Sequence, residues 1–222
     1  MDNVAHIIDT EDGSHSLFSE QFAVGYHSKY GAIQESQHVF IQAGLAPALL
    51  DKTSLRVFEM GFGSGLNAFL SLLFLSDPQK NIYFETVEAF PLPLAQVSSL
   101  NYPSLLNGST DDFRALHEAP WGEPTIITPQ FTLRKHLGTI QEVSLAGDFD
   151  VVFFDAFAPS SQPELWEAPV LEKIFQAMAP GGIFVTYCAK GVVKRTLRSI
   201  GFQVEGIPGP PGKREMTRAT KQ

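Results

Sequence analysis

The sequence lacks the features of a membrane or secreted protein. A single cysteine, Cys188, excludes an internal disulfide. The best apolar run, 68–75, is interrupted by Ser71 and falls well short of the roughly 18 residues that a membrane-spanning helix needs. The N-terminus is acidic and lacks the basic and apolar segments of a secretory signal. These absences predict a cytoplasmic protein, and its 222 residues predict one domain.

Two kinds of catalytic site are also poorly supported. The six histidines show neither H-E-x-x-H nor another ligand spacing, so no metal site is expected. In the run GFGSG at 61–65 the serine is out of register with G-x-S-x-G, which leaves a hydrolase nucleophile elbow unsupported.

Positive charge is scarce except near the C-terminus. The whole chain has a net charge of −8, which argues against a general nucleic-acid binder. Residues 185–222, however, carry eight Lys and Arg against two Glu, a local net charge of +6. This end is interpreted either as a phosphate-binding face or as a solvated helix with a charged tail, and charge alone does not decide between them.

A glycine-rich turn is the most informative motif that is present. An apolar strand from Leu55 reaches Glu59, glycines follow at 61, 63 and 65, and an apolar helix comes next. Glycine permits a tight strand-to-helix turn and lets a ligand lie directly against the backbone. The dinucleotide fingerprint G-x-G-x-x-G fits poorly, because Leu66 stands where its third glycine belongs.

Strands and helices are expected to alternate after this turn, which is typical of a mainly parallel sheet. Upstream, residues 1–54 stand outside the alternation and are interpreted as an N-terminal extension that covers a ligand cleft or packs on the sheet edge. Within it we expect a hairpin or arm at 16–26 and a helix at 31–43. The core is predicted to hold strands from 55 and at 81–88, 131–137, 149–155, 183–188, 202–207 and 215–220, and helices at 91–100, 110–119, 163–178 and 192–200.

Three acidic residues stand where predicted strands end. Glu59, Glu88 and Asp155 close the first, second and fourth strands of the core. Ligands of open α/β sheets bind beyond the carboxyl ends of the strands, so these side chains favour a site for a polar ligand. Glu88, 23 residues beyond Gly65, suits the two ribose hydroxyls of an adenosine-containing cofactor.

Sequence blocks along nearly the whole chain resemble one family. The turn resembles motif I, E/D-x-G-x-G-x-G, of the S-adenosylmethionine-dependent methyltransferases. The further blocks resemble the methyltransferase half of the MnmC family, which acts on 5-aminomethyl-2-thiouridine in tRNA. They are DGSHSLFS at 12–19, GAIQESQHVF at 31–40, EAFPL at 88–92, DAFAP at 155–159 with PELW at 163–166, and GPPGKREM at 209–216.

The resemblance implies a fold, a cofactor and a reaction. The fold is a Rossmann-like class I α/β methyltransferase with a mainly parallel seven-stranded sheet and a C-terminal antiparallel hairpin. The reaction is methyl transfer from S-adenosylmethionine to the aminomethyl nitrogen of the wobble uridine, with the tRNA anticodon loop as partner. The implied cofactor-binding residues are Glu59, Gly61, Phe62, Gly63, Gly65, Asn67, Glu88 and Thr139. At Thr139 the family often has an aspartate for the adenine amino group. Some relatives carry a fused oxidase domain, and this sequence is expected to perform only the methylation.

The remaining candidate residues concern the substrate. Asp155 is the candidate catalytic group, because a carboxylate can orient the substrate ammonium and accept its proton. Phe157 and Pro159 are candidates to flank a flipped base, and Lys213 and Arg214 to contact phosphates, while Glu35 could reach the cleft from the extension. Three alternatives remain: an N-methyltransferase of a small amine, a non-catalytic nucleoside-binding module and a nicotinamide dehydrogenase.

Overall fold

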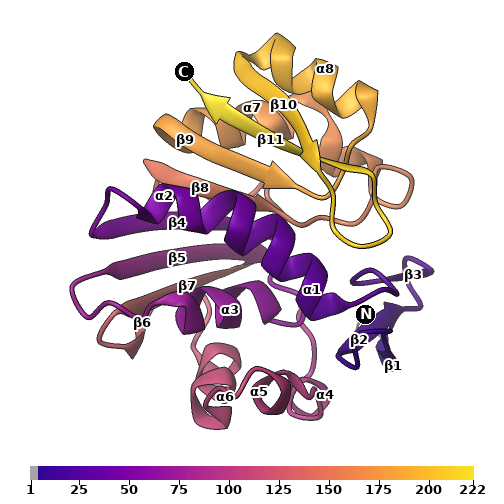
Figure 1. Cartoon of the computed structure of the whole chain (residues 1–222), viewed down its shortest axis with the longest axis vertical. Coiled ribbons are helices and arrows are strands. Elements are labelled where there is room, and N and C mark those ends of the chain that lie inside the picture. The colour runs from indigo at the N-terminus through magenta and orange to yellow at the C-terminus, as the bar shows by residue number, and fades with distance from the viewer. Residues whose placement is uncertain (1–4) are drawn as a thin grey trace.

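The computed structural model describes residues 5–222, in which one large sheet carries helices on both faces (Figure 1). The sheet has eight strands in the order β10-β11-β9-β8-β4-β5-β7-β6, and a separate three-stranded sheet has the order β1-β2-β3. The strands are β1 (Ala5–Asp9), β2 (His15–Ser19), β3 (Val24–Gly25), β4 (Ser54–Met60), β5 (Asn81–Glu88), β6 (Pro124–Thr128), β7 (Phe131–Leu137), β8 (Phe149–Phe154), β9 (Met178–Thr186), β10 (Phe202–Pro208) and β11 (Glu215–Lys221).

The helices lie between these strands along the chain. Near the N-terminus, three consecutive helical segments form one continuous rod, because the residues at their junctions have right-handed helical dihedral angles. The middle segment, η1, is π-helical. The helical segments are α1 (Ala32–Ser36), η1 (Gln37–Leu45), α2 (Ala46–Leu49), α3 (Leu66–Phe74), α4 (Leu94–Val97), α5 (Tyr102–Leu105), α6 (Thr110–Glu118), the 3₁₀ turn η2 (Pro163–Trp166), α7 (Ala168–Ala177) and α8 (Gly191–Ile200).

The mainly parallel sheet with a C-terminal hairpin is confirmed. Strand β4 pairs in parallel with β5 on one side and with β8 on the other, while β11 runs antiparallel between β9 and β10. The chain therefore reverses its direction of travel across the sheet at β4, which is where open α/β sheets bind ligands. Eight strands are present instead of the seven expected, because β6 adds an antiparallel edge strand beside β7.

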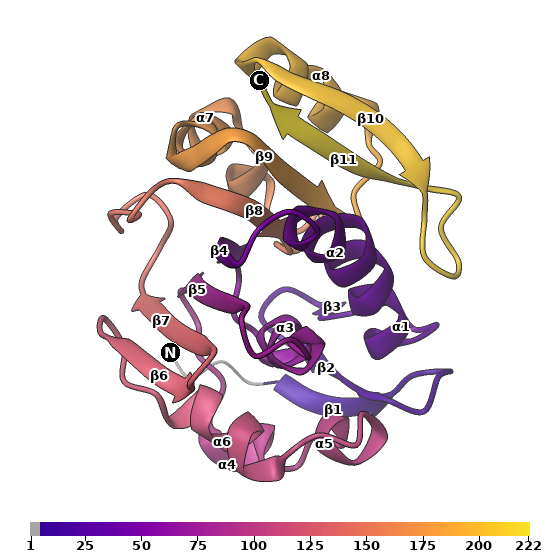
Figure 2. The same ribbon diagram turned by 60° about the vertical axis from the view of Figure 1, so that its left-hand side comes forward.

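Alternating side chains of the central strands build a hydrophobic core on each face. Val57 and Val151 pack with the long N-terminal rod, α3 and α6, whereas Phe58 and Val152 pack with α7 and α8. Figure 2 shows the two sets of helices on opposite sides of the strands. A strand covered on both faces must be apolar at nearly every position, which is why 149–154 could be identified from sequence.

Several predicted boundaries are wrong, and proline explains two of them. The helix expected at 163–178 is divided into η2 and α7, because Pro169 inside a continuous helix would remove a hydrogen bond and clash with the preceding turn. Pro91 and Pro93 likewise precede α4 and leave it only four residues. The strand expected at 183–188 begins earlier, as β9 from Met178, and its pairing with β8 shifts register. Helix α6 begins at Thr110, as expected, and Ser109 caps it.

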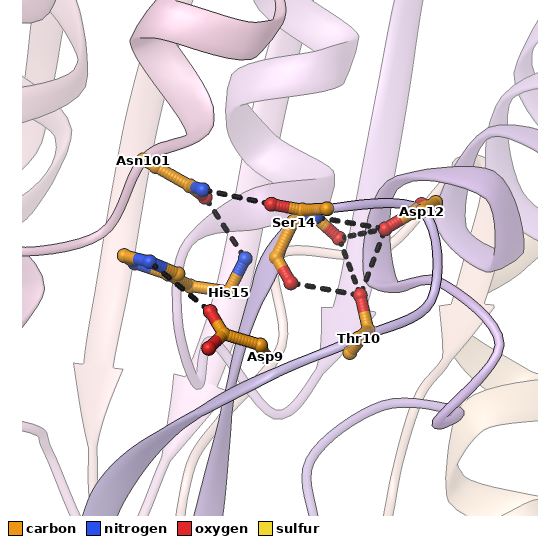
Figure 3. Close-up of polar contacts among 7 residues, drawn as sticks. Asp9, Thr10, Asp12, Ser14, His15 and Asn101 are labelled. Atoms are coloured by element: carbon orange, nitrogen blue, oxygen red, sulfur yellow. Dashed lines mark hydrogen bonds and ion pairs between the residues drawn. The ribbon is translucent and has the colours of Figure 1, made fainter.

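A polar turn at Thr10, Asp12 and Ser14, drawn in Figure 3, ties the N-terminal arm, residues 5–31, to the long rod. Asp12 accepts hydrogen bonds from the side chain of Thr10, from Ser14 and from the backbone of Gln34 at 3.1 Å. Ser14 Oγ accepts from the backbone nitrogen of Ala32 at 3.1 Å. Residues about 20 positions upstream therefore cap the first turn of α1, whose N–H groups have no partner within the helix.

Asn101 secures the other side of the same turn (Figure 3). Its amide nitrogen donates to the Gly13 carbonyl at 2.9 Å, and its amide oxygen accepts from the His15 backbone nitrogen at 2.8 Å. The hairpin expected at 16–26 is present as β2 and β3, and these contacts attach it to the body of the fold.

Candidate active site

A cavity of about 460 Å³ opens at the carboxyl ends of β4, β5 and β8. Its wall combines the glycine turn, the segments after β5, β7 and β8, and part of the N-terminal arm. The lining residues are Phe22, Tyr26, His27, Met60, Gly61, Phe62, Gly63, Ser64, Leu66, Asn67, Val87, Glu88, Ala89, Phe90, Gly138, Thr139, Ile140, Gln141, Glu142, Asp155, Ala156, Phe157, Gln162, Glu164 and Leu165.

The glycine turn needs glycine for conformation and for space. Gly65 adopts φ 72° at the start of α3, and a Cβ there would lie 2.6 Å from Nε2 of His117. Below the turn, Phe62 packs against His117 and lies near the buried ammonium of Lys135, 5.2 Å from its ring centre. The turn is therefore supported from beneath by α6 and β7.

The side chain of Lys135 places a positive charge in a buried position beneath the glycine turn, which is unusual for lysine. Its Nζ donates to the carbonyl oxygen of His117 at 2.6 Å and lies 4.6 Å from the ring centre of Trp121. Burial lowers the pKa of this ammonium to about 8, and burial together with the charge of Lys135 lowers the pKa of His117 to about 3.

Glu88 links the glycine turn to the end of β5. One carboxylate oxygen accepts from the backbone nitrogen of Gly63 at 2.9 Å, and the other accepts from that of Phe90 at 2.8 Å. Burial raises the pKa of Glu88, and these backbone N–H groups partly oppose the rise. The carboxylate thus holds two backbone segments at the wall of the cavity.

Two further acids, Glu59 and Asp155, influence each other behind the turn. The amide of Asn67 donates to Asp155, with Nδ2 and Oδ2 2.8 Å apart. Burial raises the pKa of Glu59 well above its usual range, and the charge of Asp155 adds to this rise. Asn67 and Thr86 moderate it, although neither Glu59 oxygen makes a hydrogen bond of normal geometry with residues 5–222.

Asp155 faces the cavity with a perturbed carboxyl group. Burial raises its pKa well above the usual range, the charge of Glu35 raises it further, and Asn67 and Lys213 act in the opposite direction. A carboxylate whose pKa is raised is a stronger base than that of an ordinary aspartate.

Glu35 and Lys213 form an ion pair between the two ends of the chain. The Lys213 Nζ and Glu35 Oε1 atoms are 2.6 Å apart, and the ammonium lies 3.9 Å from the ring centre of Tyr187. The second Glu35 oxygen accepts from the Ser28 backbone nitrogen at 2.7 Å. This pair affects Asp155 electrostatically but does not line the cavity itself.

Aromatic side chains of the arm meet the segment after β8. The Phe157 ring centre lies 5.1 Å from that of Phe22 and 5.1 Å from that of Tyr26. Phe22 also packs against Phe90, 5.6 Å away. The cavity therefore has an aromatic wall contributed by three separate segments.

The segment after β7 carries an exposed carboxylate. Thr139 donates to Glu142 from its hydroxyl at 2.8 Å and from its backbone nitrogen at 3.2 Å. These hydrogen bonds lower the pKa of Glu142. The family that the sequence resembles often has an aspartate where this chain has Thr139. The carboxylate of Glu142 lies beside Thr139 and is close to that position.

The structure brings most of the predicted site residues to this cavity. Gly61, Phe62, Gly63, Asn67, Glu88, Thr139, Asp155 and Phe157 line it, whereas Glu59, Gly65, Pro159, Glu35, Lys213 and Arg214 do not. Sequence patterns did not reveal Phe22, Tyr26, His27 and Glu142. The available signal was the segment 26–28, which only two residues separate from the block at 31–40. The spacing of the histidines was interpreted only with respect to metal binding.

The basic C-terminal end is largely used within the fold. Lys194 pairs with Glu215 at 2.8 Å, Arg218 pairs with Glu205 at 2.6 Å, and Lys221 donates to carbonyl oxygens at the end of α7 and the start of β9. Three exposed cations of this end, Lys190, Arg195 and Arg214, make neither an ion pair nor a side-chain hydrogen bond with residues 5–222. Arg198 is also exposed and makes no ion pair, but it donates to the Val204 carbonyl at 3.4 Å.

The described part of the chain offers neither a membrane span nor a metal cluster. Within residues 5–222, no helix is long and apolar enough to cross a bilayer. The same residues contain no group of three or more His, Cys, Asp or Glu side chains placed to hold a metal ion.

Comparisons with known proteins find one matching family model and a set of similar proteins. A family model described as S-adenosyl-L-methionine-dependent methyltransferase matches residues 125–222. The chain is 32% identical over 219 residues to the "tRNA 5-methylaminomethyl-2-thiouridine biosynthesis bifunctional protein MnmC" of Marinomonas sp., and 30% identical over 226 residues to that of Cupriavidus necator. These matches cover 93% and 91% of this chain but only 32% of each relative, so the chain spans about a third of their length.

A solved structure extends the similarity to the fold. The crystal structure of MnmC2 from Aquifex aeolicus superposes with a TM-score of 0.76 at 29% sequence identity. The match covers 98% of this chain and 70% of that one.

Proposed function

We propose, because this chain is a relative of the methyltransferase part of the MnmC proteins, that it methylates the aminomethyl nitrogen of a modified wobble uridine in tRNA. S-adenosylmethionine is the methyl donor, in agreement with the matching family model. The observation that supports this reaction most directly is Asp155, a carboxyl group with a raised pKa in the wall of the cavity.

The residues around the cavity fit this cofactor in charge. Glu59 and Asp155 are acids whose pKa values burial raises, and each pKa rises further in the field of a neighbouring acid. S-adenosylmethionine carries a sulfonium and an ammonium, and such cations would relieve this excess of negative charge. The glycine turn and Glu88 would hold the nucleoside part, with Thr139 and Glu142 near the base.

The protein must supply a neutral amine in line with the methyl group. When bound, the cofactor supplies an electrophilic methyl on a sulfonium, whose leaving group is a neutral thioether. The substrate amine, like a lysine, has a pKa of about 10 and is mostly protonated near neutrality. Asp155 orients this ammonium and takes its proton, which frees the lone pair that forms the N–C bond while the S–C bond breaks.

The perturbed environment of Asp155 makes this role chemically reasonable. An ordinary aspartate would stabilise the ammonium more strongly than it would deprotonate it. Burial and the charge of Glu35 raise the pKa of Asp155 and so narrow its difference from the pKa of the amine. Orientation in the cavity adds the advantage of a near-attack geometry.

The three unpaired cations Lys190, Arg195 and Arg214 are proposed to contact tRNA phosphates. Lys213 was expected to do the same, but it is engaged with Glu35 and is better suited to setting the electrostatics near Asp155. Phosphate contacts position a nucleic acid without reading its bases. A tRNA substrate would also place the protein in the cytoplasm.

The test is methyl transfer from labelled S-adenosylmethionine to tRNA from cells that lack this protein, followed by nucleoside mass spectrometry. Conversion of an aminomethyluridine to its methylamino form is expected. Asp155→Asn should lose at least about 100-fold in kcat, because acid–base catalysis contributes on this scale. Asp148→Asn makes the same change at an exposed position and should remain fully active.

Two results would contradict separate parts of this proposal, the tRNA substrate and the role of Asp155. Cofactor binding without transfer to tRNA would favour the small-amine alternative. An Asp155→Asn variant that methylates at the wild-type rate would contradict the role assigned to Asp155.

A further inference from the structure

His27 is a polar side chain at the cavity that the proposed reaction does not use. It lies on the arm directly after β3 and lines the same cavity as Asp155. Burial lowers its pKa to about 4, although the nearby carboxylates of Glu35 and Asp12 oppose this shift, so the ring is neutral at physiological pH. A neutral imidazole has one donor and one acceptor nitrogen.

The backbone around His27 is held at three successive residues. The Tyr26 nitrogen donates to the Leu17 carbonyl at 2.7 Å, and the His27 nitrogen donates to Ser16 Oγ at 3.2 Å. The Ser28 nitrogen donates to Glu35 at 2.7 Å. The position of the His27 ring at the cavity wall is therefore built into the fold.

Ser16 determines which ring nitrogen carries the proton. Ser16 is fully buried, and its Oγ lies 3.2 Å from Nδ1 of His27. The Ser16 oxygen already accepts the His27 backbone N–H, and Nδ1 is the remaining acceptor for its hydroxyl proton among residues 5–222. The opposite tautomer would leave that buried hydroxyl without an acceptor, which is unfavourable for a donor removed from water.

The proton of the ring is thereby directed to Nε2. Nε2 makes no hydrogen bond with residues 5–222. It is also not one of the fully buried side-chain atoms that lack a partner among these residues, so it is not completely enclosed by them. His27 thus presents an N–H donor of fixed tautomer on a residue that lines the cavity.

We propose that the Nε2–H group of His27 donates a hydrogen bond to the C4 carbonyl oxygen of the uracil base and so selects uracil over cytosine. The inference rests on the proposed function, because it takes the substrate to be a base with an aminomethyl group on C5. That group must reach Asp155, and the C4 carbonyl is next to C5 on the same edge of the ring. In cytosine an amino group replaces this oxygen, and two donors would then face each other.

The experiment compares two anticodon stem-loop RNAs that differ in one group. One carries 5-aminomethyluridine and the other 5-aminomethylcytidine at the wobble position, and kcat/KM for methyl transfer is measured with each. The wild type is expected to prefer the uridine RNA by at least about 10-fold, since a site built to bond an acceptor rejects an analogue without it.

Variants of His27 and Ser16 test the donor itself. His27→Phe should lower kcat/KM for the uridine RNA by about 10-fold or more and leave the cytidine RNA within about threefold, so that the preference disappears. His27→Gln, which retains an N–H donor, should restore part of the preference. Ser16→Ala frees the tautomer and should give an intermediate loss. Cofactor affinity and Tm, measured for each variant, control for folding.

A second measurement needs no substrate. Nitrogen-15 NMR of the free protein with labelled histidine should show Nδ1 of His27 unprotonated and Nε2 protonated at pH 7. The reverse tautomer would overturn the proposal.

The outcomes also separate this inference from the proposed function. Equal losses on both RNAs in His27→Phe, while the wild type methylates aminomethyluridine, would overturn the role of His27 and leave the function standing. A wild type inactive on both RNAs would overturn the function and this inference with it.

Discussion

The side chains of Asn67 and Asp155 are joined by a hydrogen bond of 2.8 Å, which connects the first turn of α3 to the end of β8. The motif that makes the glycine turn therefore also supplies a donor to the candidate base. Because this donor favours the charged form of Asp155, it limits how far burial raises the pKa of the carboxyl group.

Removal of the Asn67 donor should shift the pH dependence of methyl transfer. In the proposed mechanism activity requires deprotonated Asp155, so the rate should fall as pH drops through the pKa of that group in the folded protein. Asn67→Ala removes an interaction that lowers this pKa, and the acidic limb of the kcat/KM profile should move up by about one pH unit. The limb should be absent from the residual activity of Asp155→Asn, and an unmoved limb in Asn67→Ala would contradict the assignment.

Replacement of Glu88 should weaken cofactor binding. Both carboxylate oxygens accept backbone N–H groups, from Gly63 and Phe90, whereas the amide in Glu88→Gln offers one acceptor and one unwanted donor. We expect the Kd for S-adenosylmethionine to rise by at least about 10-fold in isothermal titration calorimetry. Glu118→Gln, at the exposed end of α6, is the matched control and should bind normally.

Lys135 should give the protein an unusual dependence of stability on alkaline pH. Its folded pKa of about 8 lies below the usual lysine value of 10.5, so the unfolded chain binds more protons between these pH values. The free energy of unfolding, relative to Lys135→Met, should rise by up to about 3 kcal/mol as pH increases through this window. Urea denaturation at pH 7, 9 and 10.5 measures it, and a flat difference would show that Lys135 titrates normally.

Asp12 should stabilise the attachment of the arm. Burial alone would raise its pKa, but hydrogen bonds from Ser14, Thr10 and Gln34 outweigh this effect and lower it. Asp12→Ala should cost about 1–2 kcal/mol at pH 7. This difference should shrink as pH falls below about 4 through the lowered folded pKa, when the wild-type carboxylate becomes protonated. Asp9→Ala, whose carboxylate is 87% exposed, should change stability little at either pH.

The three unpaired cations should carry part of the salt dependence of tRNA binding. Simultaneous replacement of Lys190, Arg195 and Arg214 by alanine should weaken binding and flatten the slope of log K against log salt by up to about 0.7–0.9 for each phosphate that these side chains neutralise. Arg114→Ala, in a surface ion pair with Glu118 on α6, serves as the control. An unchanged slope in the triple variant would place the tRNA on another face.

Local patterns in the sequence predicted most of the core. The strand at 149–154 is buried on both faces and nearly all apolar, and 81–88 and 131–137 were predicted with the same limits as β5 and β7. Pro169 also indicates the break before α7, although one helix was predicted over 163–178. Strand β6 has β-branched residues at 125–128, but an exposed edge strand of five residues gives only a weak pattern.

The site was less predictable where it depends on distant partners. Glu88 and Asp155 follow strands of a parallel sheet, whose carboxyl ends must lie at one edge. No comparable rule brings Lys213 to Glu35, 178 residues earlier, or places His27 of the arm in the cavity wall. Both arrangements result from tertiary packing of segments that do not pair in the central sheet.

The Glu35–Lys213 ion pair also determines when the site can exist during synthesis. A ribosome that has released the arm, the glycine turn and Asp155 has still not released Lys213, and the loop between β10 and β11 can close only after both strands have emerged. A nascent chain can therefore begin to fold its central strands while the electrostatic surroundings of Asp155 are incomplete. The electrostatic surroundings that the proposed methyl transfer needs are therefore complete only after Lys213 and β11 have emerged.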